Sequence, residues 1–247
     1  MSGAVLSATG MAMAYGGLRI FDGLDLELNP GERHAVIGPN GAGKSTFVGL
    51  LSGTLTPVAG RIELGGVDVT AMSASQRARR GLARTFQINS LFPHLTPLET
   101  LVLAVAQRTG SAGVFWKAAS RWGEVIAEAG EALDLFGLYD VRDAPTRQLA
   151  YGQQRMLEVA IAYALKPRVM LLDEPAAGLT TAQGIALFDL LDRLAGDMTC
   201  LFVEHDMAIV FRYADRISVL ADGRILAQGT PDEIRDSRAV RDAYLGH

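Results

Sequence analysis

The chain has 247 residues, of which 49% are hydrophobic and 20% charged, a composition typical of a globular protein with one sizeable core. Its formal net charge of −4 gives no reason to expect the basic surface by which proteins bind nucleic acid. The single cysteine, Cys200, excludes an internal disulfide framework and fits a reducing compartment.

The sequence carries no sign of export or of membrane insertion. Its first residues lack the basic segment and apolar core of a secretory signal peptide. No uncharged apolar run reaches the length of about 18 residues that spans a bilayer. The sequence therefore predicts a cytoplasmic protein, unless a partner holds it at a membrane.

The first third of the chain predicts strands and one helix. Residues 4–29 alternate between apolar and polar side chains, which is the period of half-buried strands. A short apolar strand then runs into a glycine-rich loop, and residues 45–53 predict a helix. A Gly-Gly turn further on predicts a hairpin. The predicted strands are 18–21, 24–28, 35–37, 61–64 and 67–69.

The middle of the chain, residues 73–148, has a mostly helical pattern with alanine-rich segments at 98–107 and 125–136. Three arginines near its start predict the solvated face of a helix. These arginines are Arg77, Arg79 and Arg80.

From Met156 onward, strands and helices alternate again, which is typical of a parallel sheet with crossover helices. The layout predicts an α/β core with a helical segment inserted in the middle. In this last part the predicted strands are 169–172, 199–203, 217–220 and 224–227, and the predicted helices are 184–194 and 208–214.

Residues 38–45 read Gly-Pro-Asn-Gly-Ala-Gly-Lys-Ser and match the phosphate-loop pattern GxxxxGK[ST]. Glycines let the backbone curl so that successive N–H groups point inward, at the N-terminus of a helix whose dipole attracts anions. Lys44 would place a positive charge on the β- and γ-phosphates, and the Ser45 hydroxyl would coordinate Mg²⁺. The loop by itself does not distinguish kinases, GTPases and transport ATPases.

Two later strands end in side chains that suit phosphate chemistry. Asp173 and Glu174 follow an apolar strand, so Asp173 could hold the Mg²⁺ shell and Glu174 could polarise an attacking water. Another apolar strand delivers His205. Because ligands bind off the carboxyl ends of parallel strands, we expect the strands that end at Gly38, Asp173 and His205 to converge on one phosphate.

The order of these motifs resembles an ABC transporter ATPase over essentially the whole chain. The resemblance implies a P-loop NTPase (RecA-like) core with an antiparallel β subdomain and an inserted α-helical subdomain. Within a single domain, 1–247, the core with its β subdomain would comprise 1–87 and 149–247, and the insert 88–148. The motifs are GPNGAGKS at 38–45, TFQ at 85–87, LAYGQ at 149–153, LLDEP at 171–175 and EHD at 204–206.

By that resemblance the chain binds ATP with Mg²⁺ and hydrolyses it. Tyr15 would stack on the adenine, and Gln87 would reach both the Mg²⁺ and the attacking water. Glu174 would be the general base, His205 would contact the γ-phosphate, and Lys44 would also be catalytic. The implied ATP-binding residues are Tyr15, Gly38, Pro39, Asn40, Gly41, Ala42, Gly43, Lys44, Ser45 and Thr46, and the implied metal ligands are Ser45, Gln87 and Asp173.

The resemblance also implies a head-to-tail dimer with two ATPs at its interface. Ala150, Tyr151, Gly152 and Gln153 would meet the ATP of the partner subunit, at the start of a helix predicted at 153–165.

The sequence departs from the family at two places. The usual signature LSGGQ carries a serine where Ala150 stands, so that contact to the phosphate must come from backbone N–H groups or elsewhere. Thr180 stands where many relatives have aspartate or asparagine, which leaves its role in communication across the dimer open.

Five sequence variants together resemble the branched-chain amino acid importer family, and within it the larger of its two ATPase subunits. They are RTFQ at 84–87, LAYGQQ at 149–154, DEPAAG at 173–178, EHDM at 204–207 and AYLG at 243–246. Such importers pair two ATPases with two transmembrane permease subunits and an extracytoplasmic substrate-binding protein. The resemblance thus implies a peripheral protein on the cytoplasmic face of the inner (plasma) membrane, in a homo- or heterodimer of ATPases, with no nucleic acid partner.

Other interpretations stay open at this point. The related importers of urea and short-chain amides share the branch, and lipopolysaccharide-export ATPases share the Tyr-Leu-Gly ending. A soluble ABC ATPase of DNA repair or translation would carry two cassettes or a long coiled coil. A regulatory module without turnover would have lost Glu174 or His205, and both are present.

Overall fold

The computed structural model describes residues 3–85, 91–110, 119–194 and 198–245. The chain divides into two compact units. The second unit contains more residues than the helical insert that the sequence predicts at 88–148. The limits of that insert stay a prediction. The first unit contains Met1–Arg84, Arg168–Pro175 and Leu191–His247, and the second contains Thr85–Pro167 and Ala176–Leu190.

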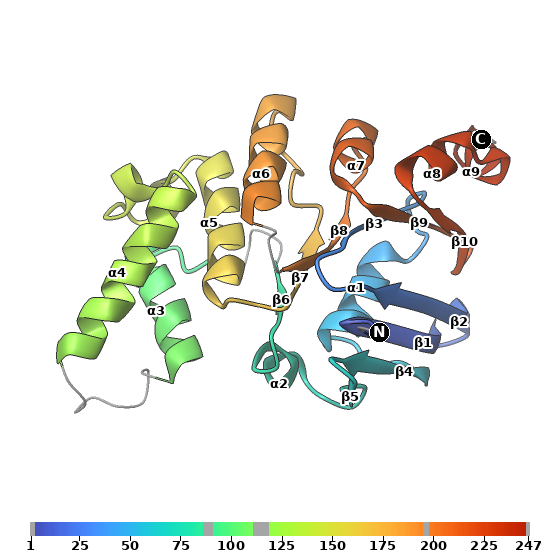
Figure 1. Cartoon of the computed structure of the whole chain (residues 1–247), viewed down its shortest axis with the longest axis horizontal. Helices are drawn as coiled ribbons and strands as arrows, with labels where there is room; N and C mark the ends of the chain where they lie inside the picture. The colour runs from blue at the N-terminus through green and yellow to red at the C-terminus, as the bar shows by residue number, and fades with distance from the viewer. Residues whose placement is uncertain (1–2, 86–90, 111–118, 195–197, 246–247) are drawn as a thin grey trace. The chain divides into compact units, whose positions relative to one another are not determined.

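The first unit is built around a six-stranded sheet in which all neighbours are parallel except the edge strand β10 (Figure 1). Its central strands are buried along their whole length, as expected for a parallel sheet covered on both faces. The strands, in spatial order, are β10 (Arg224–Gly229), β9 (Arg216–Ala221), β3 (Arg33–Ile37), β8 (Thr199–Val203), β7 (Val169–Asp173) and β6 (Leu82–Arg84).

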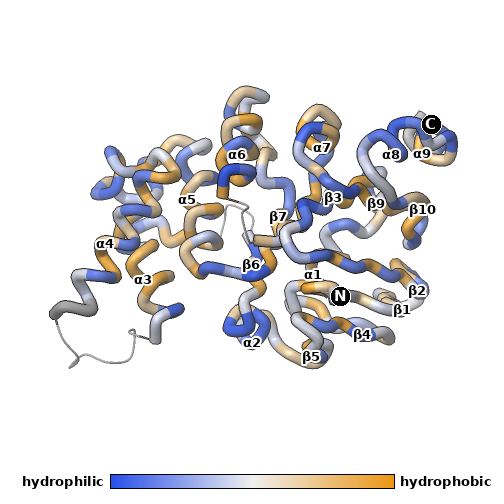
Figure 2. The backbone as a smooth tube through the Cα atoms, viewed as in Figure 1, coloured by the Kyte–Doolittle hydropathy of each residue, from blue (hydrophilic) through white to orange (hydrophobic). Residues whose placement is uncertain are grey.

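A second, antiparallel sheet has four strands. From Leu24 onward, buried and exposed residues alternate along β2 (Leu18–Leu28). Figure 2 colours the same strand by hydropathy, with hydrophobic and hydrophilic segments in turn. The two short strands expected at 18–21 and 24–28 form this single strand, whose pairing with β1 contains irregular steps that absorb the glycine between them. The strands, in spatial order, are β2 (Leu18–Leu28), β1 (Leu6–Tyr15), β4 (Ala59–Leu64) and β5 (Val67–Asp68).

The helix α1 (Lys44–Ser52) connects the cores of the two sheets. Phe47, Leu50 and Leu51 are fully buried in one hydrophobic cluster with residues of both sheets. The ring of Phe47 meets Phe21 of β2 edge to face, with 6.0 Å between centroids. The helix that follows the glycine-rich loop is therefore packed against both sheets.

The sequence prediction for the three clustered arginines is wrong for Arg77. This residue lies on α2 (Ala74–Ala78) and is fully buried, whereas Arg79 and Arg80 are exposed. A short helix at a loop–helix junction has no amphipathic period long enough to reveal which arginine points inward. The other helices of this unit are α7 (Met207–Tyr213), α8 (Pro231–Asp236) and α9 (Arg238–Leu245).

The strand β6 also corrects the sequence prediction, which treats residues 73–148 as mostly helical. Its three residues pair in parallel with β7, Leu82 opposite Val169 and Arg84 opposite Leu171. A strand this short shows too few alternations to be recognised by period, so only its partner strand identifies it.

The second unit is helical. Thr96 caps α3 through a reciprocal capping box with Glu99, and Gly110 ends it in a left-handed conformation. Glu128 on α4 pairs with Arg108 of α3 and with Lys166 beyond α5. The elements are α3 (Pro97–Thr109), α4 (Ala119–Leu135), the 3₁₀ turns η3 (Tyr139–Val141) and η4 (Thr146–Gln148), and α5 (Tyr151–Ala164). A further helix, α6 (Thr181–Leu194), begins in this unit and ends in the first.

Within the described ranges, no helix combines the length and the apolar character needed to cross a bilayer. Two helices start two or three residues earlier than the sequence predicts. The helix α5 begins at Tyr151 rather than at Gln153, and α6 at Thr181 rather than at Gly184.

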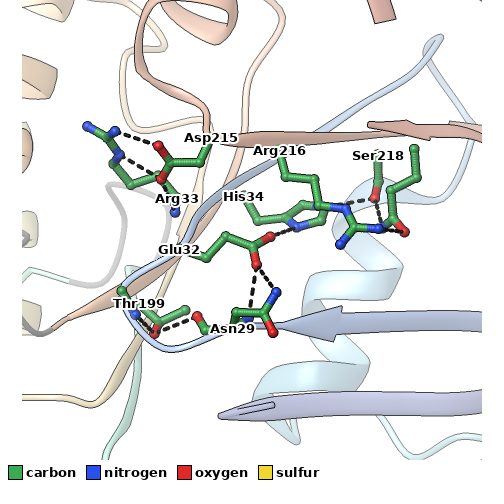
Figure 3. A network of polar contacts seen from close by, with 10 residues as sticks. Asn29, Glu32, Arg33, His34, Thr199, Asp215, Arg216 and Ser218 are labelled. Carbon is green, nitrogen blue, oxygen red and sulfur yellow. Dashed lines mark hydrogen bonds and ion pairs between the residues drawn. The ribbon is translucent and has the colours of Figure 1, made fainter. Parts of the chain in front are cut away.

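A buried polar network fixes the amino end of β3, the strand that leads into the glycine-rich loop (Figure 3). His34 is fully buried, with Nδ1 2.6 Å from Glu32 Oε1 and Nε2 2.7 Å from Ser218 Oγ. Ser218 Oγ already accepts a hydrogen bond from Gln228 Nε2 at 2.7 Å, so its own proton can go to His34 Nε2. The remaining ring proton of a neutral His34 then lies on Nδ1, facing Glu32.

This network makes Glu32 a source of pH-dependent stability. Burial opposes its ionisation, but the hydrogen bonds from His34 and Asn29 outweigh burial and hold its pKa below the usual 4.5. A lowered carboxyl pKa contributes stability above the unfolded value, and the contribution is lost as the pH falls below about 4.5. We expect Glu32→Gln to reduce the loss of unfolding free energy between about pH 5 and about pH 2, measured by urea denaturation. The exposed Glu27→Gln is the control; an equal effect in both variants would contradict the role of the network.

Candidate nucleotide site

The three motif-bearing strands are neighbours in one sheet. The spatial order β3–β8–β7 is parallel throughout, so the loop after Ile37, Asp173 at the end of β7 and the segment after Val203 leave the sheet at one edge. The expected common edge of these three strands is confirmed, and their convergence on one phosphate stays a prediction.

The glycines of the loop are required by its packing. At Gly38, a Cβ atom would lie 2.0 Å from the carbonyl oxygen of Leu220. At Gly43, which precedes α1 with φ 96°, a Cβ would lie 2.8 Å from the ring of Phe21. A side chain at either place would force the loop away from the sheet, so the backbone can follow this path only with glycine.

The loop presents N–H groups and a positive charge together. In an α-helix the N–H groups of the first turn have no carbonyl partner within the helix. In α1, helical bonding begins with Phe47 N–H donating to Gly43 O at 2.8 Å, which leaves the N–H groups of Lys44, Ser45 and Thr46 to an anion.

The Lys44 ammonium is held at the loop by hydrogen bonds to Gly38 O (2.8 Å) and Pro39 O (3.0 Å). Burial lowers its pKa, and the nearby carboxylates of Glu174 and Asp173 oppose that shift. Phosphate oxygens are stronger acceptors than these carbonyls, because they carry a full charge. The ammonium is therefore positioned to exchange carbonyl partners for phosphate.

We expect Lys44→Ala to weaken ATP binding about tenfold to a hundredfold, since a charged hydrogen bond contributes roughly 1.5–3 kcal/mol. Titration with a fluorescent ATP analogue measures the dissociation constant. The exposed Arg79→Ala, which removes the same charge, is the control. An unchanged affinity in Lys44→Ala would exclude this loop as the phosphate site.

Two carboxylates stand at the carboxyl end of β7. The Asp173 side chain is 4% exposed and pairs with Arg84 at 3.0 Å. Glu174 follows in the left-handed region, with φ 49°, and its N–H donates to Val203 O at 3.0 Å. A positive φ is uncommon outside glycine, and such backbone strain clusters at functional sites.

His205 is exposed beside a buried acid. Its side chain is 70% exposed, and its Nδ1 lies 3.8 Å from the buried carboxylate of Glu204, which also accepts the His205 N–H at 3.2 Å. Asp206 then caps α7 by accepting from Ala208 N–H at 2.8 Å. These hydrogen bonds hold the backbone on both sides of His205, and its ring stays accessible to solvent.

The predicted signature lies in the second unit, at the N-terminus of α5. Ala150 is the N-cap residue, and its N–H donates to Gln153 Oε1 at 3.0 Å. The Tyr151 hydroxyl donates to Ala177 O at 3.0 Å. Its ring covers Gly178, where a Cβ would lie 2.7 Å from the ring. The unusual tyrosine of the signature thus holds the segment that follows Glu174-Pro175.

The N-terminus of α6 lies against the same segment. Gln183 Oε1 accepts hydrogen bonds from the N–H (3.0 Å) and the hydroxyl (3.1 Å) of Thr180. The Gln183 amide also lies close to Gly152, where a Cβ would be 3.1 Å from Nε2. Thr180 therefore keeps a local capping role that an aspartate or asparagine at this place could also fill.

Two predicted site residues are not placed with the others. The Tyr15 ring, at the end of β1, is about half exposed, and its role in adenine stacking stays a prediction. Gln87 lies outside the described residues. Two features were missed by sequence reasoning: the ion pair between Arg84 and Asp173, and the hydrogen bond from Tyr151 to Ala177. Each joins residues far apart in sequence, and no local pattern signals either contact.

The residues present fit a nucleotide with Mg²⁺. The N–H groups at the start of α1 and Lys44 suit phosphate, while Ser45 and Asp173 are the oxygen donors that Mg²⁺ prefers. Among the described residues there is no group of three or more His, Cys, Asp or Glu side chains suited to a metal. An Mg²⁺ ion bound mainly through nucleotide phosphates and water needs no such group.

Comparisons with known proteins agree with this geometry. A profile of the ABC transporter family matches residues 21–177, and a profile of the branched-chain amino acid ATP-binding cassette transporter family matches residues 224–247. The chain is 38% identical to the high-affinity branched-chain amino acid transport ATP-binding protein BraF of Pseudomonas aeruginosa, and 39% identical to LivG of Escherichia coli K12. Both alignments cover 100% of this chain and 99% of the relative. A solved ATP-binding cassette of an ABC transporter, in its ADP conformation, is 25% identical, with a TM-score of 0.85 and 99% of each chain covered.

Proposed function

The chain belongs to the ABC transporter family as one of its ATP-hydrolysing subunits, and we propose that it drives an importer of branched-chain or other hydrophobic amino acids. The observation that carries the cargo class is the match of residues 224–247 to the profile of branched-chain amino acid cassettes, at the end of a chain that aligns over its full length with BraF and LivG.

The reaction is the hydrolysis of ATP to ADP and phosphate. The N–H groups at the start of α1 and the Lys44 ammonium hold the phosphates in place. When bound, Mg²⁺ would offset the negative charge that develops on the phosphate oxygens. Ser45 and Asp173 would hold it, together with Gln87.

Glu174 is proposed as the general base. A water oxygen forms a bond to the γ-phosphorus while its proton moves to the Glu174 carboxylate, and the bond between the γ-phosphorus and the bridging oxygen breaks to release ADP. His205, exposed at the neighbouring strand end, would donate a hydrogen bond to the γ-phosphate. Tyr15 would stack on the adenine.

The signature would act across a dimer. The N-terminus of α5, with Ala150 as its N-cap, offers backbone N–H groups that can bind an anion. These groups would bind the γ-phosphate of the ATP on a second ABC ATPase subunit, identical or homologous. Two ATPs would close the dimer, and hydrolysis would open it.

The cycle would be coupled to two permease subunits in the membrane, with a substrate-binding protein supplying cargo on the outer side. The chain would then act as a peripheral subunit at the cytoplasmic face of the inner (plasma) membrane. The helical segment 88–148 would transmit closure of the ATPase dimer to the permeases.

Uptake by cells tests the proposal. In a strain that lacks this chain, the wild-type chain should restore uptake of radiolabelled leucine, isoleucine and valine, and Glu174→Gln should not. Excess unlabelled urea or acetamide should leave the restored uptake unchanged. Restored uptake of urea or acetamide instead of the amino acids would assign the chain to the related amide importers, and restored lipopolysaccharide export would assign it to an exporter.

A further inference from the structure

Arg84 joins the carboxylate proposed for Mg²⁺ to the end of the phosphate-loop helix. It is the last residue of β6, beside β7 in the sheet. Its Nη2 donates to Asp173 Oδ2 at 3.0 Å. Both side chains are largely buried, with 17% of Arg84 and 4% of Asp173 exposed. The contact is therefore a shielded ion pair rather than a surface one.

The other nitrogen of the guanidinium is fixed to α1. Arg84 Nη1 lies 3.2 Å from Ser52 Oγ and 3.2 Å from Thr54 Oγ1. Both hydroxyls also bond the carbonyl oxygen of Gly49, in the last turn of that helix. A planar guanidinium held at both terminal nitrogens has one orientation, so it fixes the position of the carboxylate it binds.

The ion pair also decides the charge around Asp173. A carboxylate that is 4% exposed is unfavourable without a partner, and Arg84 provides a full positive charge. A divalent cation that approaches Asp173 must therefore share the carboxylate with Arg84 and be repelled by it.

We propose that Arg84 is a positioning residue for Asp173: its ion pair orients this carboxylate before Mg²⁺ binds, and its positive charge lowers the affinity of the site for Mg²⁺. The inference rests on the proposed nucleotide site. It predicts two opposite effects of removing Arg84: tighter Mg²⁺ binding and slower hydrolysis. Loss of a purely structural contact would weaken both.

The Mg²⁺ dependence of nucleotide binding tests this proposal in the full chain. A fluorescent ATP analogue is titrated at fixed concentration with MgCl₂, for the wild type, Arg84→Gln, Arg84→Lys and the exposed control Arg80→Gln. Removing one positive charge roughly 6 Å from a divalent cation in a watery dielectric corresponds to about tenfold in binding constant. We expect the half-saturating Mg²⁺ concentration to fall about tenfold in Arg84→Gln and to stay unchanged in Arg80→Gln.

Arg84→Lys separates charge from orientation. Lysine keeps the positive charge but lacks the planar guanidinium that orients the carboxylate. The half-saturating Mg²⁺ concentration of Arg84→Lys should therefore stay within about twofold of the wild-type value, while its kcat at saturating Mg²⁺ falls. If Arg84→Gln does not fold, an unchanged kcat in Arg84→Lys would overturn the proposal.

Thermal unfolding gives a readout without turnover. Arg84→Gln should lower the midpoint in the absence of Mg²⁺ and nucleotide, and Mg²⁺ with ADP should narrow the gap to the wild type, because the metal then partners Asp173. An unchanged or higher half-saturating Mg²⁺ concentration in Arg84→Gln would overturn the proposal. Mg²⁺-dependent nucleotide binding and hydrolysis by the wild type test the nucleotide site itself, so the two failures are distinguishable.

Discussion

Glu174→Gln is expected to reduce the rate of ATP hydrolysis at least a hundredfold while ATP binding persists, because general base catalysis contributes about 10²–10⁴-fold and an amide cannot accept the proton. The substitution keeps the shape of the side chain, so the left-handed turn at φ 49° and the hydrogen bond from Glu174 N–H to Val203 O should be retained. Phosphate release measures the rate.

The same variant is expected to accumulate as a closed dimer with ATP. In the proposed cycle, binding energy from two ATPs favours closure of the dimer, and without hydrolysis the interface would stay closed. Size-exclusion chromatography with and without ATP detects the dimer, and Glu27→Gln, an exposed carboxylate of β2, serves as the matched control. Hydrolysis at the wild-type rate by Glu174→Gln would rule out Glu174 as the base.

The sequence was sufficient for the parts of the site that depend on local pattern. The glycines of the loop, the apolar strand before it and the helix after it lie within a few residues of one another, so their spacing determines their geometry. The edge at which Asp173 and His205 meet the loop follows from a general rule of parallel sheets. These features could be predicted without knowing any contact.

The side chains that support the site could not be predicted in this way. Arg84 ends a strand of three residues and contacts Ser52 and Asp173, which lie 32 and 89 positions away. Tyr151 departs from the usual signature, and only its hydrogen bond to Ala177 O, 26 positions away, shows what the ring does. A contact between residues so far apart in sequence depends on tertiary packing, and no periodic pattern of residue types predicts it.

Arg77 is the clearest example of this limit, and it carries the largest expected effect on stability. Its guanidinium is fully buried and donates four hydrogen bonds to backbone carbonyls. Two acceptors, Leu50 O (2.6 Å) and Leu51 O (2.7 Å), belong to the last turn of α1. A positive charge at a helix C-terminus also stabilises the helix dipole. Arg77 thus caps the helix whose other end carries the phosphate loop.

Burial lowers the pKa of Arg77, with Asp68 opposing the shift, yet an arginine side chain stays protonated throughout the range in which proteins fold. The four carbonyls accept the hydrogen bonds of this charge, and Asp68 compensates it electrostatically. We expect Arg77→Ala to lower the free energy of unfolding by about 3–5 kcal/mol, because it leaves these carbonyls buried without a donor. In a chain of this length the thermal midpoint should fall by roughly 10 °C.

Arg77→Lys should recover only part of the loss, since one ammonium cannot reach acceptors in Leu50, Thr70 and Met72 at the same time. Arg80→Ala, at an exposed position one turn later, should change stability by less than about 0.5 kcal/mol. Urea denaturation of the three variants gives the comparison. Equal stability of Arg77→Ala and Arg80→Ala would show that the carbonyls at the end of α1 find other donors, and that the phosphate-loop helix does not depend on this cap.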